Sequence, residues 1–215
     1  MGDKNMKVIE KLASMQGRKD DIPNQELARE IAQNQDEEAI RVIVQNLENK
    51  DKNIQSDCIK VLYEIGYINP QLIQQYVDEF LMLIDSKNNR LVWGGMIALS
   101  TIATLKSDRI FEAIDKIYNA IKNGSVITVD NGIKTLARIA SVKEEYNREI
   151  FSFLIKHLKT CRPKDIPQHA EFISVAVTNH NKSEFLKVLE QRKEILKPSQ
   201  LKRVNKVINS LTKSK

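Results

Sequence analysis

Apolar residues recur along this chain with the spacing of an amphipathic helix. Between residues 40 and 47 they fall three, four and seven positions after the first one, which places their side chains on one helical face. A second helical spacing, of one, four and seven positions, follows the polar turn 49–53. The two apolar sets are Ile40, Ile43, Val44 and Leu47, then Cys58, Ile59, Leu62 and Ile65. The pattern therefore predicts a pair of helices, here called A and B.

This helix pair repeats every 37 residues without a gap. Steps of 37 from Leu47 and from Leu62 meet an apolar residue each time. The two series are Leu47, Ile84, Ile121, Leu158 and Leu62, Leu99, Leu136, Ile173. A period of this length indicates a helical repeat protein. Because one pair cannot bury its apolar faces alone, we expect neighbouring pairs to stack and cover each other.

The register sets the expected B helices at about 54–67, 90–105, 126–141 and 165–178. Asn53, Asn89 and Ser125 have the residue types that cap helix N-termini. One B-helix column holds the small residues Cys58, Gly95 and Gly132, followed by His169 in the fourth repeat. Small side chains in this column should let a neighbouring helix approach closely, and the packing should change at His169.

The two ends of the chain fall outside the strict register. Residues 1–35 and 182–215 each read as a capping pair, with Pro23 and Pro198 placed to open helices. We therefore expect an all-α, right-handed α-solenoid of about six antiparallel pairs, or twelve helices. Residues 36–181 form its four regular repeats. The whole chain, 1–215, is expected to be a single domain and a monomer.

The repeat resembles the HEAT and armadillo class over roughly residues 36–180. Asp51, Ile54, Cys58 and the dipeptide Val61-Leu62 stand where HEAT units carry Asp, Val, Ala and Ala-Leu, and Ala98-Leu99 matches the dipeptide outright. The Asp51 column continues as Asn88, Ser125 and Arg162, so the polar ladder of the class is not sustained. The resemblance implies a binding protein and does not identify its partner.

One face of the B helices points away from the packing columns and carries unexpected aromatic and apolar residues. Such residues on a polar surface are typical of interfaces. The candidate partner-binding residues are Trp93, Ile97, Tyr63, Tyr67, Lys60, Asp130 and Lys134. The alternative is that Trp93 folds down between repeats as packing. The expected function is a non-enzymatic scaffold that binds a protein or peptide segment on the concave face formed by the B helices, with no small-molecule substrate.

Charge is unevenly distributed in a chain whose formal charge is +6 and whose pI is about 9.2. From residue 182 onward, ten basic residues accompany three acidic ones. The basic patch is Arg192, Lys193, Lys197, Lys202, Arg203 and Lys206. It supports an alternative function, binding of nucleic-acid phosphates. At fold level this alternative resembles the HEAT-like DNA glycosylases, with Trp93 and Asp130 as the matching aromatic and acidic residues.

Cysteine and histidine spacing gives no recognisable catalytic or metal motif. Cys58 and Cys161 form no disulfide framework, which favours a reducing cytoplasm. His157, His169 and His180 match neither HExxH nor a Cys/His cluster, so no metal and no cofactor are expected. Cys161 adjoins Arg162, a neighbour of the kind that lowers thiol pKa values, but we expect no reactive role for this cysteine. The longest apolar run, 80–84, is too short to span a membrane.

Overall fold

The computed structural model describes residues 2–213, and this range contains thirteen α-helices, five short 3-10 helices and no strand. The chain divides into two compact units. The first ends at Gly132 and the second begins at Ile133. The boundary falls inside helix α9 (Val126–Ala140). The single domain of six pairs therefore stays a prediction from the sequence, and each unit has a core of its own.

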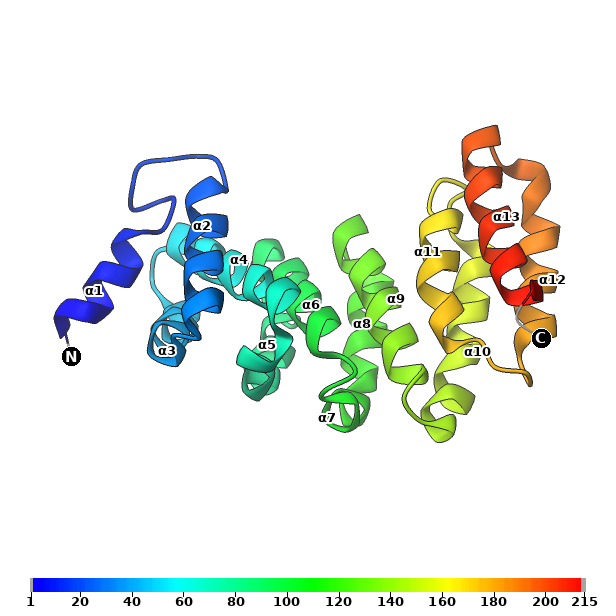
Figure 1. Cartoon of the computed structure of the whole chain (residues 1–215), viewed down its shortest axis with the longest axis horizontal. Helices are drawn as coiled ribbons and strands as arrows, with labels where there is room; N and C mark the ends of the chain where they lie inside the picture. Colours follow the sequence, from blue (N-terminus) through cyan, green and yellow to red (C-terminus); the bar gives the residue numbers. More distant parts are fainter. Residues whose placement is uncertain (1, 214–215) are drawn as a thin grey trace. The chain divides into compact units, whose positions relative to one another are not determined.

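The first unit contains two layers of helices, visible in the blue to green part of Figure 1. The B layer is formed by α2, α4 and α6, each in contact with the next, while in the A layer α1 contacts α3 and α5 contacts α7. Three short 3-10 helices also belong to this unit. Asn46–Glu48 lies between α3 and α4, and Pro70–Leu72 and Gln74–Tyr76 lie between α4 and α5. The helices are α1 Gly2–Glu10, α2 Ile22–Asn34, α3 Glu37–Gln45, α4 Lys52–Ile68, α5 Val77–Leu83, α6 Asn89–Ile102, α7 Ser107–Glu112, α8 Ile114–Asn123 and the first half of α9.

The second unit repeats this layering. Helix α10 packs against α12 and α11 packs against α13, as the yellow to red helices of Figure 1 show. After α9 come α10 Glu144–Thr160, α11 Ile166–Ile173 with its 3-10 extension Ser174–Ala176, α12 Lys182–Arg192 with the 3-10 turn Lys193–Ile195, and α13 Pro198–Lys213. Among the helices of residues 2–213, none combines the length and the hydropathy needed to cross a bilayer.

The expected core column is confirmed. Leu62, Leu99, Leu136 and Ile173 have no exposed surface, and they lie on α4, α6, α9 and α11. These four helices match the expected B helices within a few residues at their starts. The sequence period therefore identified both the helices and the faces that they bury.

The small-residue column lets the A and B helices of one repeat approach closely. A Cβ atom built on Gly95 would lie 2.9 Å from Leu83 Cβ and 3.1 Å from the Phe80 carbonyl oxygen, both on α5. One built on Gly132 would lie 2.4 Å from Ile121 Cγ1 on α8. Real Cβ contacts are longer than this, so a larger residue at either position would push the two helices apart.

Three local details differ from the sequence predictions. The caps of α4 and α6 are Asp51 and Asn88, whose side chains accept from the Asn53 and Arg90 amides at 2.7 and 3.1 Å. The helices therefore begin earlier than expected. The third A helix is interrupted at Ala113, whose φ of −105° and ψ of 21° are not helical. Within the described residues, that break makes thirteen helices where twelve were expected.

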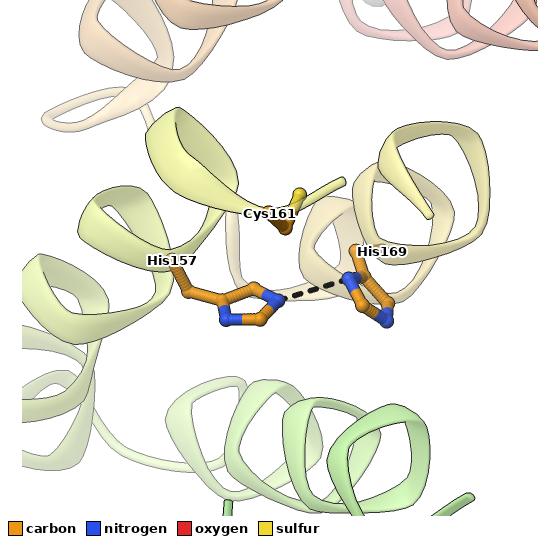
Figure 2. Close-up of side chains that lie close together, drawn as sticks. All are labelled: His157, Cys161 and His169. Atoms are coloured by element: carbon orange, nitrogen blue, oxygen red, sulfur yellow. Dashed lines mark hydrogen bonds between the residues drawn. The ribbon is translucent and has the colours of Figure 1, made fainter. Parts of the chain in front are cut away.

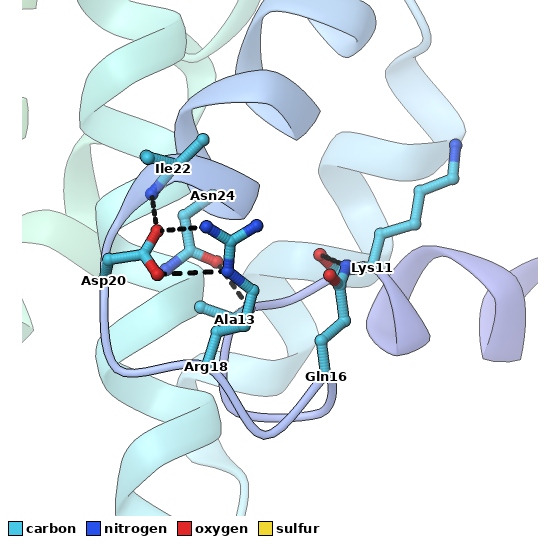
Figure 3. A network of polar contacts seen from close by, with 7 residues as sticks. All are labelled: Lys11, Ala13, Gln16, Arg18, Asp20, Ile22 and Asn24. Carbon is cyan, nitrogen blue, oxygen red and sulfur yellow. Dashed lines mark hydrogen bonds and ion pairs between the residues drawn. The ribbon is translucent and has the colours of Figure 1, made fainter.

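The loop between α1 and α2 is held by a polar network (Figure 3). Asn24, on α2, is fully buried; its Oδ1 accepts from the Ala13 amide at 3.0 Å and its Nδ2 donates to Asp57 Oδ1, on α4, at 2.8 Å. Arg18 forms a forked ion pair with Asp20. The N-terminal pair is thereby tied to the first regular repeat.

Candidate functional site

An aromatic cluster joins two neighbouring B helices of the first unit. It consists of Tyr63 and Tyr67, one turn apart on α4, and Trp93 on α6. The Tyr63 ring centroid lies 6.2 Å from that of Trp93 and 6.0 Å from that of Tyr67, with the two tyrosines edge to face. Trp93 is partly exposed and Tyr67 is 52% exposed. Trp93 thus lies partly exposed beside these tyrosines, as a candidate binding residue on this face should.

Two of the expected surface residues are instead buried. Tyr63 is only 5% exposed and Ile97 only 7%. Tyr63 is covered because the Trp93 ring and the Lys60 ammonium, 4.9 Å from its centroid, pack against it. Nearly all of α6 is buried between its neighbours, and Ile97 lies in that stretch. Trp93 and Tyr67 are therefore the parts of the aromatic cluster open to a partner, with Tyr63 as their support.

Lys60 is held beside the aromatic cluster by acidic neighbours. Its Nζ lies 2.7 Å from Glu64 and 3.5 Å from Asp21. Partial burial acts to lower the pKa of Lys60, but hydrogen bonds to Glu64 and Tyr63 outweigh it and raise the pKa above its usual value. The Lys60 ammonium is therefore charged, and the carboxylates of Glu64 and Asp21 balance its charge. Held in this way, it can position the Tyr63 ring.

The last two expected site residues, Asp130 and Lys134, lie one turn apart on α9. Asp130 belongs to the first unit and Lys134 to the second. The Lys134 Nζ lies 5.8 Å from the Phe172 ring centroid in the second unit. Burial, followed by the charge of Arg138, lowers the pKa of Lys134. Asp130 and Lys134 are both half-buried. Lys134 contacts the ring of Phe172, which lies in the same unit.

Three of the six basic-patch residues are engaged with groups of the second unit. Arg203 forms a forked ion pair with Glu171 at 2.9 and 2.6 Å, and Lys193 pairs with Glu190 at 2.7 Å. Arg192 donates to the main-chain oxygens of residues 159 and 161, at the end of α10. The other three, Lys197, Lys202 and Lys206, are exposed, as is Arg203 in its ion pair.

The second unit also brings together three residues whose spacing showed no motif. His157 Nε2 lies 2.9 Å from His169 Nδ1, and the Cys161 sulfur completes a group of donor atoms that all lie within 4.8 Å of one another (Figure 2). His169 is 1% exposed. The sequence signals were Cys161 one turn after His157, and a histidine in a column that elsewhere holds small residues.

Arg162 does not activate Cys161, because its charge has only a small effect on the thiol. Burial is the largest effect and raises the pKa of the Cys161 thiol to about 11, against the opposing charge of Arg192 and a smaller effect of Arg162. The Arg162 guanidinium is turned to Asp165, with its Nε 2.6 Å from the carboxylate. The thiol is therefore neutral in the folded protein.

Comparison with known proteins gives the fold. No protein-family model matches the sequence, and no curated protein matches it. Solved structures do: an engineered protein is 17% identical over 97% of this chain and 96% of its own, and a designed armadillo repeat protein in complex with the peptide (KR)4 is 16% identical over 94% and 97%, both with a TM-score of 0.65. The fold is an armadillo/HEAT-like α-solenoid. Computationally designed armadillo repeat proteins for modular peptide recognition match this solenoid equally well, at 16% identity and a TM-score of 0.65 over 94% and 98%.

Proposed function

We propose that this solenoid is a non-enzymatic scaffold that binds a protein or peptide segment across α4 and α6. The observation that carries the proposal is the aromatic cluster, in which Trp93 and Tyr67 keep exposed surface on two adjacent B helices. The structural neighbours designed for peptide recognition support the same use of the fold.

The physical argument rests on rigid aromatic anchors. Trp and Tyr contribute large contact areas at a small cost in conformational entropy, and they are the residues most often found at binding hot spots. Tyr63, held by Lys60 and Trp93, fixes the two exposed rings. Axes of packed helices lie about 8–10 Å apart, which about three residues of extended chain can span. An extended segment can therefore reach both rings.

The experiment is a selection of random displayed peptides on the full chain, followed by affinity measurements. Trp93→Ala should weaken the selected peptides about tenfold or more, as loss of a hot-spot anchor does. Tyr118→Ala is the matched control, because it truncates a half-buried aromatic side chain in the A layer of the same unit. It should leave peptide affinity unchanged. If the two substitutions weakened peptide affinity equally, at equal stability, the proposal that peptides bind at the aromatic cluster would be wrong.

The alternative, binding of nucleic acid, makes a different prediction. A titration with duplex DNA at several salt concentrations should then show an affinity that falls steeply with salt. Charge reversal at Lys202 and Lys206 should abolish it, while Trp93→Ala should not. That result, together with no selected peptides, would replace the peptide scaffold by a nucleic-acid-binding one.

A further inference from the structure

The histidine and cysteine group of the second unit has the composition of a metal site. It offers two imidazole nitrogens and one sulfur, from His157, His169 and Cys161. We propose that these three residues bind a divalent, thiol-seeking cation, for which Zn²⁺ is the best fit. Imidazole and thiolate are the ligands that zinc prefers, and sites with three protein ligands leave a fourth position to water.

The fold places the three donors without help from the ion. His157 lies in the last turn of α10 and Cys161 follows it by four residues, so both face the same side of the helix end. A short loop then leads to α11, where His169 lies one turn from the start. Two arginines hold this corner: Arg162 is paired with Asp165 inside the loop, and Arg192 of α12 binds the carbonyl of Cys161.

The distances fit zinc after small side-chain movements. With metal–nitrogen and metal–sulfur bonds of about 2.0–2.3 Å, tetrahedral ligand atoms lie roughly 3.3–3.6 Å apart. The two nitrogens are closer than this, at 2.9 Å, and no two donor atoms of the group are more than 4.8 Å apart. A rotation of the imidazoles apart and a shift of the sulfur by roughly 1 Å brings all three onto one ion. Both lie within the range of side-chain torsions, because His157 and Cys161 are only half-buried.

The proton balance is simple. In the structure one of the facing imidazole nitrogens must carry the hydrogen that it shares with the other. On binding, that hydrogen moves to the far nitrogen of the same ring, through solvent, and both facing nitrogens become ligands. The Cys161 thiol, which donates to the Leu158 carbonyl at 3.7 Å, loses its proton to solvent as the sulfur–metal bond forms. One proton is released for each ion bound.

The bound ion would add a link between two helices that are already joined by a five-residue loop and by the His157–His169 hydrogen bond. Cys161 and His157 belong to the end of α10 and His169 to α11, so coordination ties the A and B helices of the fourth repeat. Binding to the folded state alone stabilises it. The inferred role is therefore structural, and it is independent of the peptide-binding surface in the first unit.

The test is a titration of the reduced full chain, free of any histidine tag, with Co²⁺. We expect one equivalent to bind, with the visible bands of tetrahedral Co²⁺ and a sulfur-to-cobalt charge-transfer band. Added Zn²⁺ should bleach both and raise the Tm by several degrees. Cys161→Ser should lose the charge-transfer band and His157→Gln should weaken binding at least tenfold.

Two matched controls complete the test. His180→Gln changes the one other histidine, which is exposed, and Cys58→Ser changes the one other cysteine. Both should keep the spectrum of the wild type. Circular dichroism establishes that each variant is folded. The inference is overturned if the wild type shows no tetrahedral Co²⁺ bands, if the charge-transfer band survives in Cys161→Ser, or if His180→Gln weakens binding as much as His157→Gln does.

Discussion

Cys58 lies in the small-residue column of α4 with no exposed surface. Burial, and then the nearby charge of Asp57, raises the pKa of its thiol far above the usual cysteine value. In the unfolded chain the thiol ionises near its ordinary pKa, about 8.5, while in the folded chain it stays protonated. The folded state therefore binds the extra proton, so stability falls as pH rises above that value.

We expect the free energy of unfolding to decrease with pH more steeply in the wild type than in Cys58→Ala, by up to about 1.4 kcal/mol per pH unit above the ordinary pKa. Denaturant unfolding at a series of pH values between 6 and 10 measures this. Below pH 7 the gap between the two proteins should be constant, because neither state ionises there. Parallel curves over the whole range would show that the thiol is ionised equally in both states.

At the scale of elements, the close contact of α5 and α6 depends on Gly95. Replacing an ordinary helical glycine by alanine stabilises a helix by about 0.5–1 kcal/mol. Here the new methyl group would press on the Phe80 carbonyl, which is main chain and cannot rotate away. We expect Gly95→Ala to destabilise the protein by about 1–3 kcal/mol, measured by denaturant unfolding.

The direction of the stability change on Gly95→Ala shows whether Gly95 sets the distance between α5 and α6. Arg90→Ala, at an exposed position in the first turn of the same helix, controls for changes in helix propensity and should have little effect. If Gly95→Ala gave a more stable protein, α5 and α6 would have room to separate and the column would not set their distance.

The exact helix boundaries could not be predicted from the sequence. The 37-residue period located the B helices because their apolar columns are buried in every repeat. It could not locate the caps, since Asp51 and Asn53, or Asn88 and Asn89, are all suitable residue types, and only backbone geometry decides between them. Nor does periodicity register the single non-helical residue Ala113, which divides α7 from α8.

At the scale of the whole molecule, the two units give separate reporters of unfolding. Trp93 is the only tryptophan and belongs to the first unit, whereas circular dichroism follows helices throughout. In repeat proteins stability is set by each repeat and its neighbours. Leu99→Ala, in the first unit, should therefore lower the stability reported by fluorescence by about 2–5 kcal/mol.

Leu154→Ala makes the matched truncation in the second unit, at an equally buried leucine of α10. It should shift part of the circular dichroism transition and leave the fluorescence transition nearly unchanged. If both substitutions displaced both signals equally, the chain would unfold as one cooperative body.

The solenoid could be predicted from the sequence because each stacked repeat buries apolar residues at the same positions. These positions therefore recur every 37 residues, and four repeats make the pattern clear. The candidate sites follow no such period. Tyr63 and Ile97 proved buried, because cover from a neighbouring helix is a tertiary effect. Arg203, on α13, forms an ion pair with Glu171 on α11, which the sequence pattern does not indicate. His157 and His169 meet only because a loop reverses the chain between them.

Helix α9 crosses the boundary between the units without a break. A fragment that ends at residue 132 would therefore expose a severed helix, with half of its hydrogen-bonded turns missing their continuation. The natural places to divide this protein for expression are the turns at either end of α9, near Gly124 and Ser141, and not the point where its contacts are sparsest. Whichever fragment keeps the whole of α9 should fold, and its counterpart should begin or end with an exposed apolar face that the missing helix once covered.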